Sequence, residues 1–388
     1  MQRKSAGDVT IISTVGEEKC QAFIPAPLPP QPELKIDADL QTQLGRAMAA
    51  LGRLDAISTI LPNSSLFLYM YIRKEAVLSS QIEGTQSSLS DLLKHESKAA
   101  PGVPMDDVQE VSNYVVAMEY GLRRIKNGFP LSLRLFKEIH KILLGHGRGA
   151  EKNPGEFRRS QNWIGGTRPG NAIYVPPPPD NVMECMGQLE NFLHDDPIRT
   201  PLLIKAALAH VQFESIHPFL DGNGRLGRLL ITLLFCSEGI LSEPTLYLSL
   251  YLKTHRSEYY RLLQQVRTNG DWESWLAFFL TGVEETAGQA VSTAKRLVEL
   301  FNDDQTRVES LGRAAGSALR IHRIMQQRPI VNIKQAAEET SVSIPTATTA
   351  LGHLERLGVV HQVPSEGRAK LYGYAKYIRI LSEGTEPL

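Results

Sequence analysis

The 388-residue sequence is short of cysteine, of long apolar runs and of net charge. Its three cysteines, Cys20, Cys185 and Cys236, are far apart and form no C-x-x-C pair, which argues against a disulfide framework and a thiolate zinc site. The N-terminus has no apolar core of signal-peptide length, and the most apolar run, residues 229–236, is too short to cross a bilayer. We therefore expect a cytoplasmic protein with no membrane partner.

The charges of the chain cancel, because lysine and arginine together number 42, as do aspartate and glutamate. This balance argues against a histone-like or a polybasic membrane-binding protein. Hydrophobic residues make up 42% of the chain and charged residues 22%, a composition typical of globular folds. The length suggests two or three domains.

Hydrophobic periodicity predicts a mainly α fold. Residues 1–36 look irregular and end in a proline-rich stretch, whereas apolar residues recur at three and four positions farther on. We divide the rest into an N-terminal helical region (37–115), a helical core (116–295) and a C-terminal module (311–388).

Two local patterns refine this division. Within the core, β-prone runs at residues 161–164 and 172–175 flank a turn rich in glycine, proline and asparagine, which predicts a β-hairpin. Within the C-terminal module, three expected helices precede two β-prone runs around a glycine turn. That order predicts a winged helix-turn-helix.

The chemistry concentrates in one run, HPFLDGNGRLGR. In it, Gly222, Asn223 and Gly224 form a loop whose backbone can take positive φ and direct several N–H groups to one point. The loop leads into an apolar helix, whose N-terminus adds free donors and the positive end of its dipole. Such a nest suits an anion, and the guanidinium groups of Arg225 and Arg228 suit phosphate oxygens.

Two titratable residues flank this nest. Asp221 would repel a phosphate unless a divalent cation such as Mg²⁺ lay between them. His217 lies just upstream, and an imidazole can accept a proton at neutral pH. The alternative is a helix-capping turn with an incidental histidine. We prefer the anion site, because a cap requires neither two arginines nor a carboxylate.

The same run resembles the signature of the Fic family, H-x-F-x-[D/E]-G-N-G-R-x-x-R, and matches it at every fixed position. The resemblance extends over roughly residues 37–290. It implies a Fic-type helical core with a β-hairpin flap over the active site. The implied activity is transfer of AMP from ATP to Ser, Thr or Tyr hydroxyl groups of proteins.

The resemblance also implies roles for single residues. His217 would take the proton from the target hydroxyl, Asp221 would bind Mg²⁺ that bridges the α- and β-phosphates, and Arg228 would contact the γ-phosphate. Phe219 is expected to anchor the loop in the core. The remaining motif residues would hold or border the nucleotide: Gly222, Asn223, Gly224, Arg225, Leu226 and Gly227.

The flap has two expected roles. Its edge, residues 161–165, would pair with the main chain of a protein substrate, although a purely structural hairpin is the alternative if the motif is set aside. By similarity to the family, four flap residues would also border the nucleotide: Asn162, Trp163, Ile164 and Gly165.

Farther along the chain, Tyr259 and Tyr260 match a tyrosine pair that lines the nucleotide site of the family. Adjacent helix residues point about 100° apart, so we expect one of the two in the core. Arg267 stands where relatives can carry an asparagine near the base, which leaves its role open.

A second resemblance concerns inhibition. Ser79, Glu83 and Gly84 match the inhibitory pattern [S/T]-x-x-x-E-[G/N] of the family. The spacing of four puts Ser79 and Glu83 on one helix face, and Gly84 can end the helix. The alternative is a solvated glutamate near a helix end. We expect Glu83 to pair with Arg228 and so to autoinhibit AMP transfer; AMP removal stays open.

The C-terminal module is mildly basic, but its expected recognition helix offers mainly threonines, His353 and Arg356. DNA contact and protein docking are therefore equal alternatives. The competing function is an ATP-sensing, DNA-binding transcriptional regulator. An intact His217 favours the enzyme, because sensing needs the nest but no base. The sequence leaves a homo-oligomer open.

Overall fold

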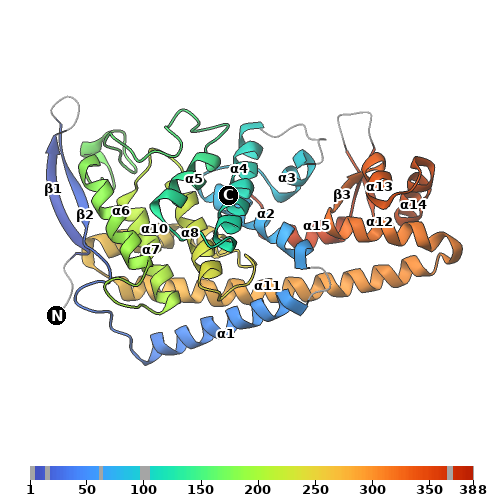
Figure 1. The fold of residues 1–388 in the computed structure, drawn as a ribbon, viewed down its shortest axis with the longest axis horizontal. Coiled ribbons are helices and arrows are strands. Elements are labelled where there is room, and N and C mark those ends of the chain that lie inside the picture. The colour runs from blue at the N-terminus through green and yellow to red at the C-terminus, as the bar shows by residue number, and fades with distance from the viewer. Residues whose placement is uncertain (1–4, 14–17, 61–63, 97–104, 365–369, 388) are drawn as a thin grey trace. The chain divides into compact units, whose positions relative to one another are not determined.

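A computed structural model describes residues 5–13, 18–60, 64–96, 105–364 and 370–387. The predicted mainly α architecture is confirmed (Figure 1). The chain divides into two compact units, each described by itself below. The first comprises residues 1–52, 113–244 and 251–286, and the second comprises residues 53–112, 245–250 and 287–388.

Helices account for most of both units. Helices α4 (Met105–Lys126) and α11 (Trp272–Glu309) span residues 115 and 295, where we placed domain limits, and the linear division into domains stays a prediction. The helices outside the C-terminal module are α1 (Ala38–Ile60), α2 (Ser64–Ile82), α3 (Leu89–Glu96), α4 (Met105–Lys126), α5 (Leu133–Leu143), α6 (Pro179–Leu193), α7 (Leu202–Ile216), α8 (Asn223–Ser237), α9 (Ser249–Thr254), α10 (Arg256–Asn269) and α11 (Trp272–Glu309).

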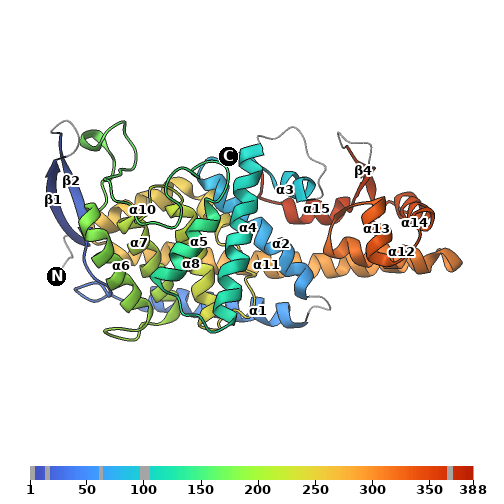
Figure 2. The same ribbon diagram turned by 45° about the horizontal axis from the view of Figure 1, so that its top comes forward.

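The core of the first unit is built on α7 and α8. Every residue of α7 from Leu203 to Ile216 is buried, as expected of a helix that is apolar around most of its circumference. The predicted burial of α8 is confirmed as well. The two helices pack against each other, side by side in Figures 1 and 2. Residues 217–222 join them and carry the start of the motif.

The expectation that residues 1–36 are irregular is wrong for residues 7–13 and 19–25, which form strands, whereas residues 26–36 form neither a helix nor a strand. Strand β1 (Gly7–Ser13) pairs antiparallel with β2 (Lys19–Pro25). Two buried side chains of β2 pack against Val175, and the N–H of Phe23 donates to the carbonyl of Val175 at 2.9 Å. The strands form because a segment far along the chain supplies their apolar cover and a hydrogen-bond partner, which a local reading of sequence cannot include.

The predicted hairpin within residues 161–175, which we call the flap, is smaller than expected. Its two β-prone runs meet in a single antiparallel bridge between Ile164 and Tyr174. The two glycines after Ile164 adopt left-handed φ of +68° and +70°, and the next residues include a short 3₁₀ helix, η1 (Pro169–Asn171). The prolines after Val175 have no N–H to donate, so the ladder cannot continue.

In the second unit, the C-terminal module contains the three predicted helices followed by the two predicted strands, with further elements that we did not predict, among them the strand β3 and the helix α15. Its three strands pair antiparallel in the order β3-β5-β4. A capping box between Asn332 and Gln335 starts α13. The winged helix-turn-helix assignment stays a prediction. The elements are η2 (Gly312–Ala314), α12 (Ala315–Gln327), β3 (Ile330–Asn332), α13 (Ile333–Thr340), α14 (Ile344–Arg356), β4 (His361–Val363), β5 (Leu371–Gly373) and α15 (Ala375–Ser382).

Among the described helices, none has both the length and the apolar character needed to cross a bilayer.

Candidate functional site

The predicted base lies at the point where α7 ends. His217 adopts a left-handed conformation, with φ 49° and ψ 59°, while its N–H still donates to the carbonyl of Phe213 at 2.9 Å. A left-handed backbone costs a non-glycine residue about 1–2 kcal/mol, so the surroundings must hold it. The residue is half-buried, so part of it is accessible to solvent. The chain therefore turns abruptly out of the helix at His217.

Asn223 fixes the loop that follows. Its side-chain oxygen accepts from the N–H of Phe219 at 2.9 Å, and its side-chain nitrogen donates to the carbonyl of the same residue at 2.8 Å. Gly222 precedes the helix with φ 72° and ψ 7°. The first N–H groups of a helix have no acceptor within it, so the start of α8 presents donors beside this pinned loop. Such an end suits an anion.

The charged motif residues surround the same helix start. Arg225 and Arg228 are buried, with 1% and 2% of their surface exposed, whereas the side chain of Asp221 is 35% exposed. One carboxylate oxygen of Asp221 accepts from the N–H of Gly222 at 2.5 Å and lies 3.5 Å from a guanidinium nitrogen of Arg225. The first two turns of α8 therefore carry two buried cations, and the loop before them carries one partly accessible carboxylate.

His140 lies beneath the loop, and sequence reasoning did not find it. Its ring stacks on Phe219 at 3.7 Å between centroids, which confirms Phe219 as a core anchor. Its Nδ1 accepts from the N–H of Gly155, so its Nε2 carries the proton and donates to the carbonyl of Asp221, both at 2.9 Å. Burial lowers the pKa of His140 to about 4, so the ring is neutral at pH 7. The only sequence signal was a histidine on the apolar face of α5.

The flap contacts the loop through one of its four predicted residues. The side-chain nitrogen of Asn162 donates to the carbonyl of Phe219 at 3.0 Å. Trp163 is 41% exposed, and Ile164 uses its backbone for the bridge to the second half of the flap. Gly165 has the left-handed φ that a glycine accepts without strain. The flap thus joins the site by its stem and leaves Trp163 toward solvent.

The tyrosine pair on α10 divides as predicted. Tyr259 is 1% exposed and donates its hydroxyl proton to Nε2 of the buried His210 at 2.9 Å, whereas Tyr260 is 41% exposed. The other nitrogen of that imidazole, Nδ1, donates to the carbonyl of Gly227 at 3.0 Å. Tyr259 therefore supports α8 from behind, as does Leu226, which is buried in the same helix. Tyr260 alone of the pair is accessible.

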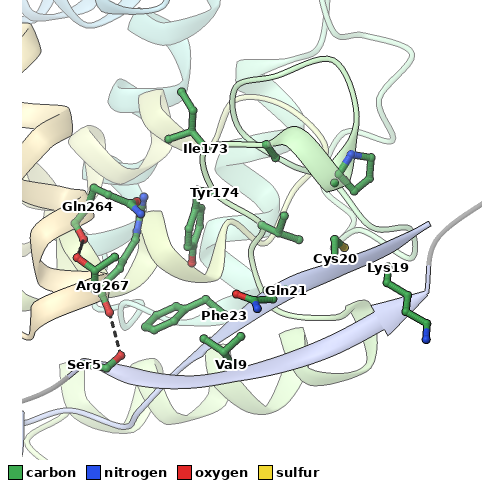
Figure 3. A pocket seen from close by; sticks show the side chains of 15 residues that line it. Ser5, Val9, Lys19, Cys20, Gln21, Phe23, Ile173, Tyr174, Gln264 and Arg267 are labelled. Carbon is green, nitrogen blue, oxygen red and sulfur yellow. Dashed lines mark hydrogen bonds between the residues drawn. The ribbon is translucent and has the colours of Figure 1, made fainter.

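Arg267, on α10, packs against the C-terminal end of α7. It donates to the carbonyl of Glu214 and to the hydroxyl of Ser215, both at 3.1 Å, and its guanidinium stacks over the ring of Tyr174 at 3.8 Å. It also lines a pocket of about 580 Å³ between β1–β2, the flap and α10 (Figure 3). In this pocket Ser5 bonds the backbone carbonyl of Arg267.

The inhibitory pattern lies in the second unit. Helix α2 ends at Ile82, and Gly84 follows with φ 96°, as expected of a residue that ends a helix. Ser79 is buried within the helix, whereas Glu83 is exposed in the turn after it. The predicted shared helix face therefore stops one residue short of Glu83.

Among the described residues, no group of three or more His, Cys, Asp and Glu side chains gathers as a metal site.

Comparisons with known proteins agree with this geometry. Residues 41–123 match the model of the Fic/DOC family N-terminal region, and residues 130–235 match the model of the Fic/DOC family. The protein adenylyltransferase Fic of Aedes aegypti is 32% identical over 260 residues, which cover 62% of this chain and 49% of that protein. The Drosophila erecta protein of the same name is 30% identical over 208 residues, which cover 53% and 39%. The chain thus spans less than half the length of these relatives.

Solved structures show the same fold. A Fic family protein from Desulfovibrio desulfuricans G20 matches with a TM-score of 0.57 at 18% identity, covering 89% of this chain and 98% of that one. A fragment of Fic-1 from C. elegans matches with a TM-score of 0.51 at 22% identity, covering 67% and 74%. The helical core with its pinned loop is thus the Fic fold. The two matched regions, residues 41–123 and 130–235, are similar to those of the Fic/DOC family.

Proposed function

We propose that this chain is a protein adenylyltransferase, which transfers AMP from ATP to Ser, Thr or Tyr hydroxyl groups of target proteins. The observation that carries the proposal is the short path from a half-buried His217, through a loop pinned by Asn223, to the start of α8. A proton acceptor and an anion site thus adjoin each other. The printed names of the relatives from Aedes aegypti and Drosophila erecta support the same activity.

His217 would act as the general base. It would accept the proton of the target hydroxyl while that oxygen attacks the α-phosphorus of ATP. The bond from the α-phosphorus to the oxygen bridging to the β-phosphate would break, and pyrophosphate would leave with the electron pair. The products are an O-linked AMP ester, pyrophosphate and a protonated imidazole that returns its proton to solvent.

The start of α8 would stabilise the charge that develops on the leaving group. The N–H groups of Asn223 and Gly224 and the buried guanidinium of Arg225 are fixed before the reaction, so they need no reorganisation. Arg228, one turn farther along the helix, would contact the γ-phosphate. Asp221 would hold Mg²⁺, which when bound neutralises phosphate charge. Its partly exposed carboxylate fits an ion shared with phosphate oxygens.

The protein substrate would lie along the flap. The N–H of Ile164 pairs with Tyr174 on one side of the strand, at 2.8 Å, and the edge at residues 161–165 is proposed to pair with a target main chain. The exposed ring of Trp163 offers apolar surface next to that edge.

DNA contact by the C-terminal module stays a prediction. On α14, the hydroxyls of Thr348 and Thr349 donate to carbonyls of their own helix.

Labelled ATP tests the activity. The protein incubated with ATP labelled at the α-phosphate should acquire label on itself or on proteins of an added lysate, and His217→Ala should abolish it. ATP labelled at the γ-phosphate serves as the control and should label nothing. Label that enters from the γ-phosphate, or that survives His217→Ala, would contradict the proposal. Tight ATP binding without transfer would favour a nucleotide sensor.

We further propose that Glu83 restrains this activity by pairing with Arg228. The two residues belong to different compact units, and the proposal rests on the inhibitory pattern and on their opposite charges. A carboxylate on Arg228 would occupy the guanidinium that otherwise binds the γ-phosphate, so ATP would bind in an unproductive pose.

Substitution of Glu83 tests the restraint. Glu83→Gly should raise the rate of AMP transfer at saturating ATP and Mg²⁺, by about 10-fold or more if one charge-assisted pair of roughly 1.5–3 kcal/mol is removed. Glu83→Gln keeps the length of the side chain without its charge and should raise the rate to a smaller extent. Unchanged or slower transfer by Glu83→Gly would refute the restraint while leaving the activity itself intact.

A further inference from the structure

The backbone around His217 shows an unbroken series of hydrogen bonds. The last carbonyls of a helix have no partner within it and need donors from elsewhere. Here the carbonyls of residues 214–219 all receive them, from four other parts of the first unit. Arg267 donates to Glu214 at 3.1 Å, and Tyr174 donates to Ser215 at 2.5 Å. Arg158 donates to Ile216 at 3.4 Å and to both His217 and Pro218 at 2.9 Å. Asn162 and Asn223 donate to Phe219 at 3.0 and 2.8 Å.

Arg158 supplies three of these bonds, to consecutive carbonyls on both sides of the left-handed turn. Its Nη2 donates to Ile216 and its Nε to His217, while its own backbone N–H donates to Pro218. A planar guanidinium has its donors in a fixed fork. The fork and the backbone together therefore define the direction in which the chain leaves α7.

The charge of Arg158 is unusual for a buried residue. The side chain is 3% exposed, and each hydrogen bond that it makes with described residues goes to a carbonyl, including those of Ser160 and Pro177. Burial lowers its pKa to about 10, so it stays protonated at neutral pH. A buried cation without a carboxylate is costly, and the negative dipole end of α7 offsets part of that cost. Packing alone would be served better by an apolar residue.

The left-handed backbone of His217 explains why Arg158 bonds the carbonyls around it. A left-handed histidine would relax toward ordinary backbone angles if its flanking carbonyls were free. A base must be held close to its productive geometry, and displacement by about 1 Å can lower a rate by about 100-fold.

We propose that Arg158 is a positioning residue for His217, which holds the turn at the end of α7 so that the imidazole stays directed at the reacting hydroxyl. This inference rests on the proposed adenylyltransferase activity for its rate effect, but the restraint on the turn exists independently of any activity.

The kinetic test uses three variants. Arg158→Met removes the fork and should lower kcat for AMP transfer by about 100-fold with the KM for ATP changed by less than about two-fold, because the nucleotide contacts remain. Arg158→Lys restores the charge and one donor and should recover part of the loss. Lys205→Met is the matched control, since it removes a different buried cation, one near the start of α7 that pairs with Asp195 at 2.7 Å. It should lower stability and leave kcat unchanged.

Hydrogen exchange supplies the second measurement. The peptide that spans residues 213–219 should exchange its amides faster by about 10-fold in Arg158→Met and at the parent rate in Lys205→Met, at equal fractions folded. The inference is overturned if Arg158→Met keeps both kcat and the exchange rate, or if Lys205→Met reproduces its effects. If the parent protein transfers no AMP, the proposed activity fails alone, and the exchange comparison still decides whether Arg158 holds the turn.

Discussion

His210 should make the first unit sensitive to acid. The imidazole is fully buried between the carbonyl of Gly227 and the hydroxyl of Tyr259. Because a carbonyl only accepts, Nδ1 carries the single ring proton and Nε2 accepts from the tyrosine. Burial above all lowers the pKa of His210 to about 3; the bond to Gly227 opposes this shift, and the charges of Arg228 and Arg267 add to it.

The size and the sign of the effect follow from linkage. The pKa of His210 in the folded protein lies below that of an unfolded histidine, near 6.5. The stability that its neutral form contributes is therefore complete above about pH 6.5 and is lost as the pH falls toward 3. At about pH 5 the unfolded chain has bound this proton and the folded chain has not, which costs about 2 kcal/mol.

A comparison of two proteins at two pH values isolates this loss. Urea unfolding of the parent and of His210→Gln, at about pH 7.5 and about pH 5, gives four free energies of unfolding. The decrease on acidification should be about 2 kcal/mol larger for the parent. Trp275 reports the transition, because its ring centroid lies 5.8 Å from that of His210. Burial lowers the pKa of His322, in the second unit, to about 4. Its contribution is the same in the parent and in His210→Gln, so it cancels in the difference between the two decreases.

Two results would refute the reasoning. An equal decrease in both proteins would mean that His210 does not enter the linkage at all. A larger decrease in His210→Gln would mean that the protonated imidazole is stabilised in the fold, and that the bonding assigned to Gly227 and Tyr259 is wrong.

Other contacts behind the loop give further predictions. A methyl group on Gly227 would lie 2.5 Å from a carboxylate oxygen of Glu214, so Gly227→Ala should cost about 1–3 kcal/mol of unfolding free energy. Gly187→Ala, in α6 with nothing within 4 Å, should instead stabilise by about 0.5–1 kcal/mol, and urea midpoints that move together would contradict the assigned clash. Tyr259→Phe loses a buried hydrogen bond and should cost about 1 kcal/mol. Tyr260→Phe should leave stability unchanged and raise the KM for ATP. A loss of stability in Tyr260→Phe together with a raised KM in Tyr259→Phe would mean that Tyr260 is the structural residue and Tyr259 the nucleotide contact.

The sequence pattern predicted the structure correctly where neighbouring residues determine the backbone. The glycine at 222 and the apolar residues after it predicted both the loop and the buried start of α8. Gly84 likewise predicted the end of α2, and the 100° between adjacent helix residues predicted that Tyr259 and Tyr260 would divide between core and surface. In each case the local backbone geometry was enough for the prediction, although the partner that buries Tyr259, His210, lies far away in the chain.

Distant interactions were out of reach of the same reasoning. The strands β1 and β2 depend on Val175, and the stacking of His140 on Phe219 joins residues that lie far apart in the chain. Arg158 follows a glycine turn and reads as an ordinary surface arginine until the end of α7 is placed against it. For the flap, the prediction gave too much regular structure. Its composition predicted a hairpin, but left-handed glycines and prolines limit it to one bridge.

The bonding of the flap stem has a consequence for how such a protein can diversify. At the stem of the flap, Arg158 bonds the carbonyls of both Pro177 and His217, so a change there would disturb the turn that carries the proposed base. The side chains of Trp163 and Ile173, next to the Ile164–Tyr174 bridge, are instead 41% and 72% exposed. Under the proposed activity, mutations at these two side chains would change the choice of target and leave the turn at His217 intact, so partner choice and reactivity would evolve separately within one short segment.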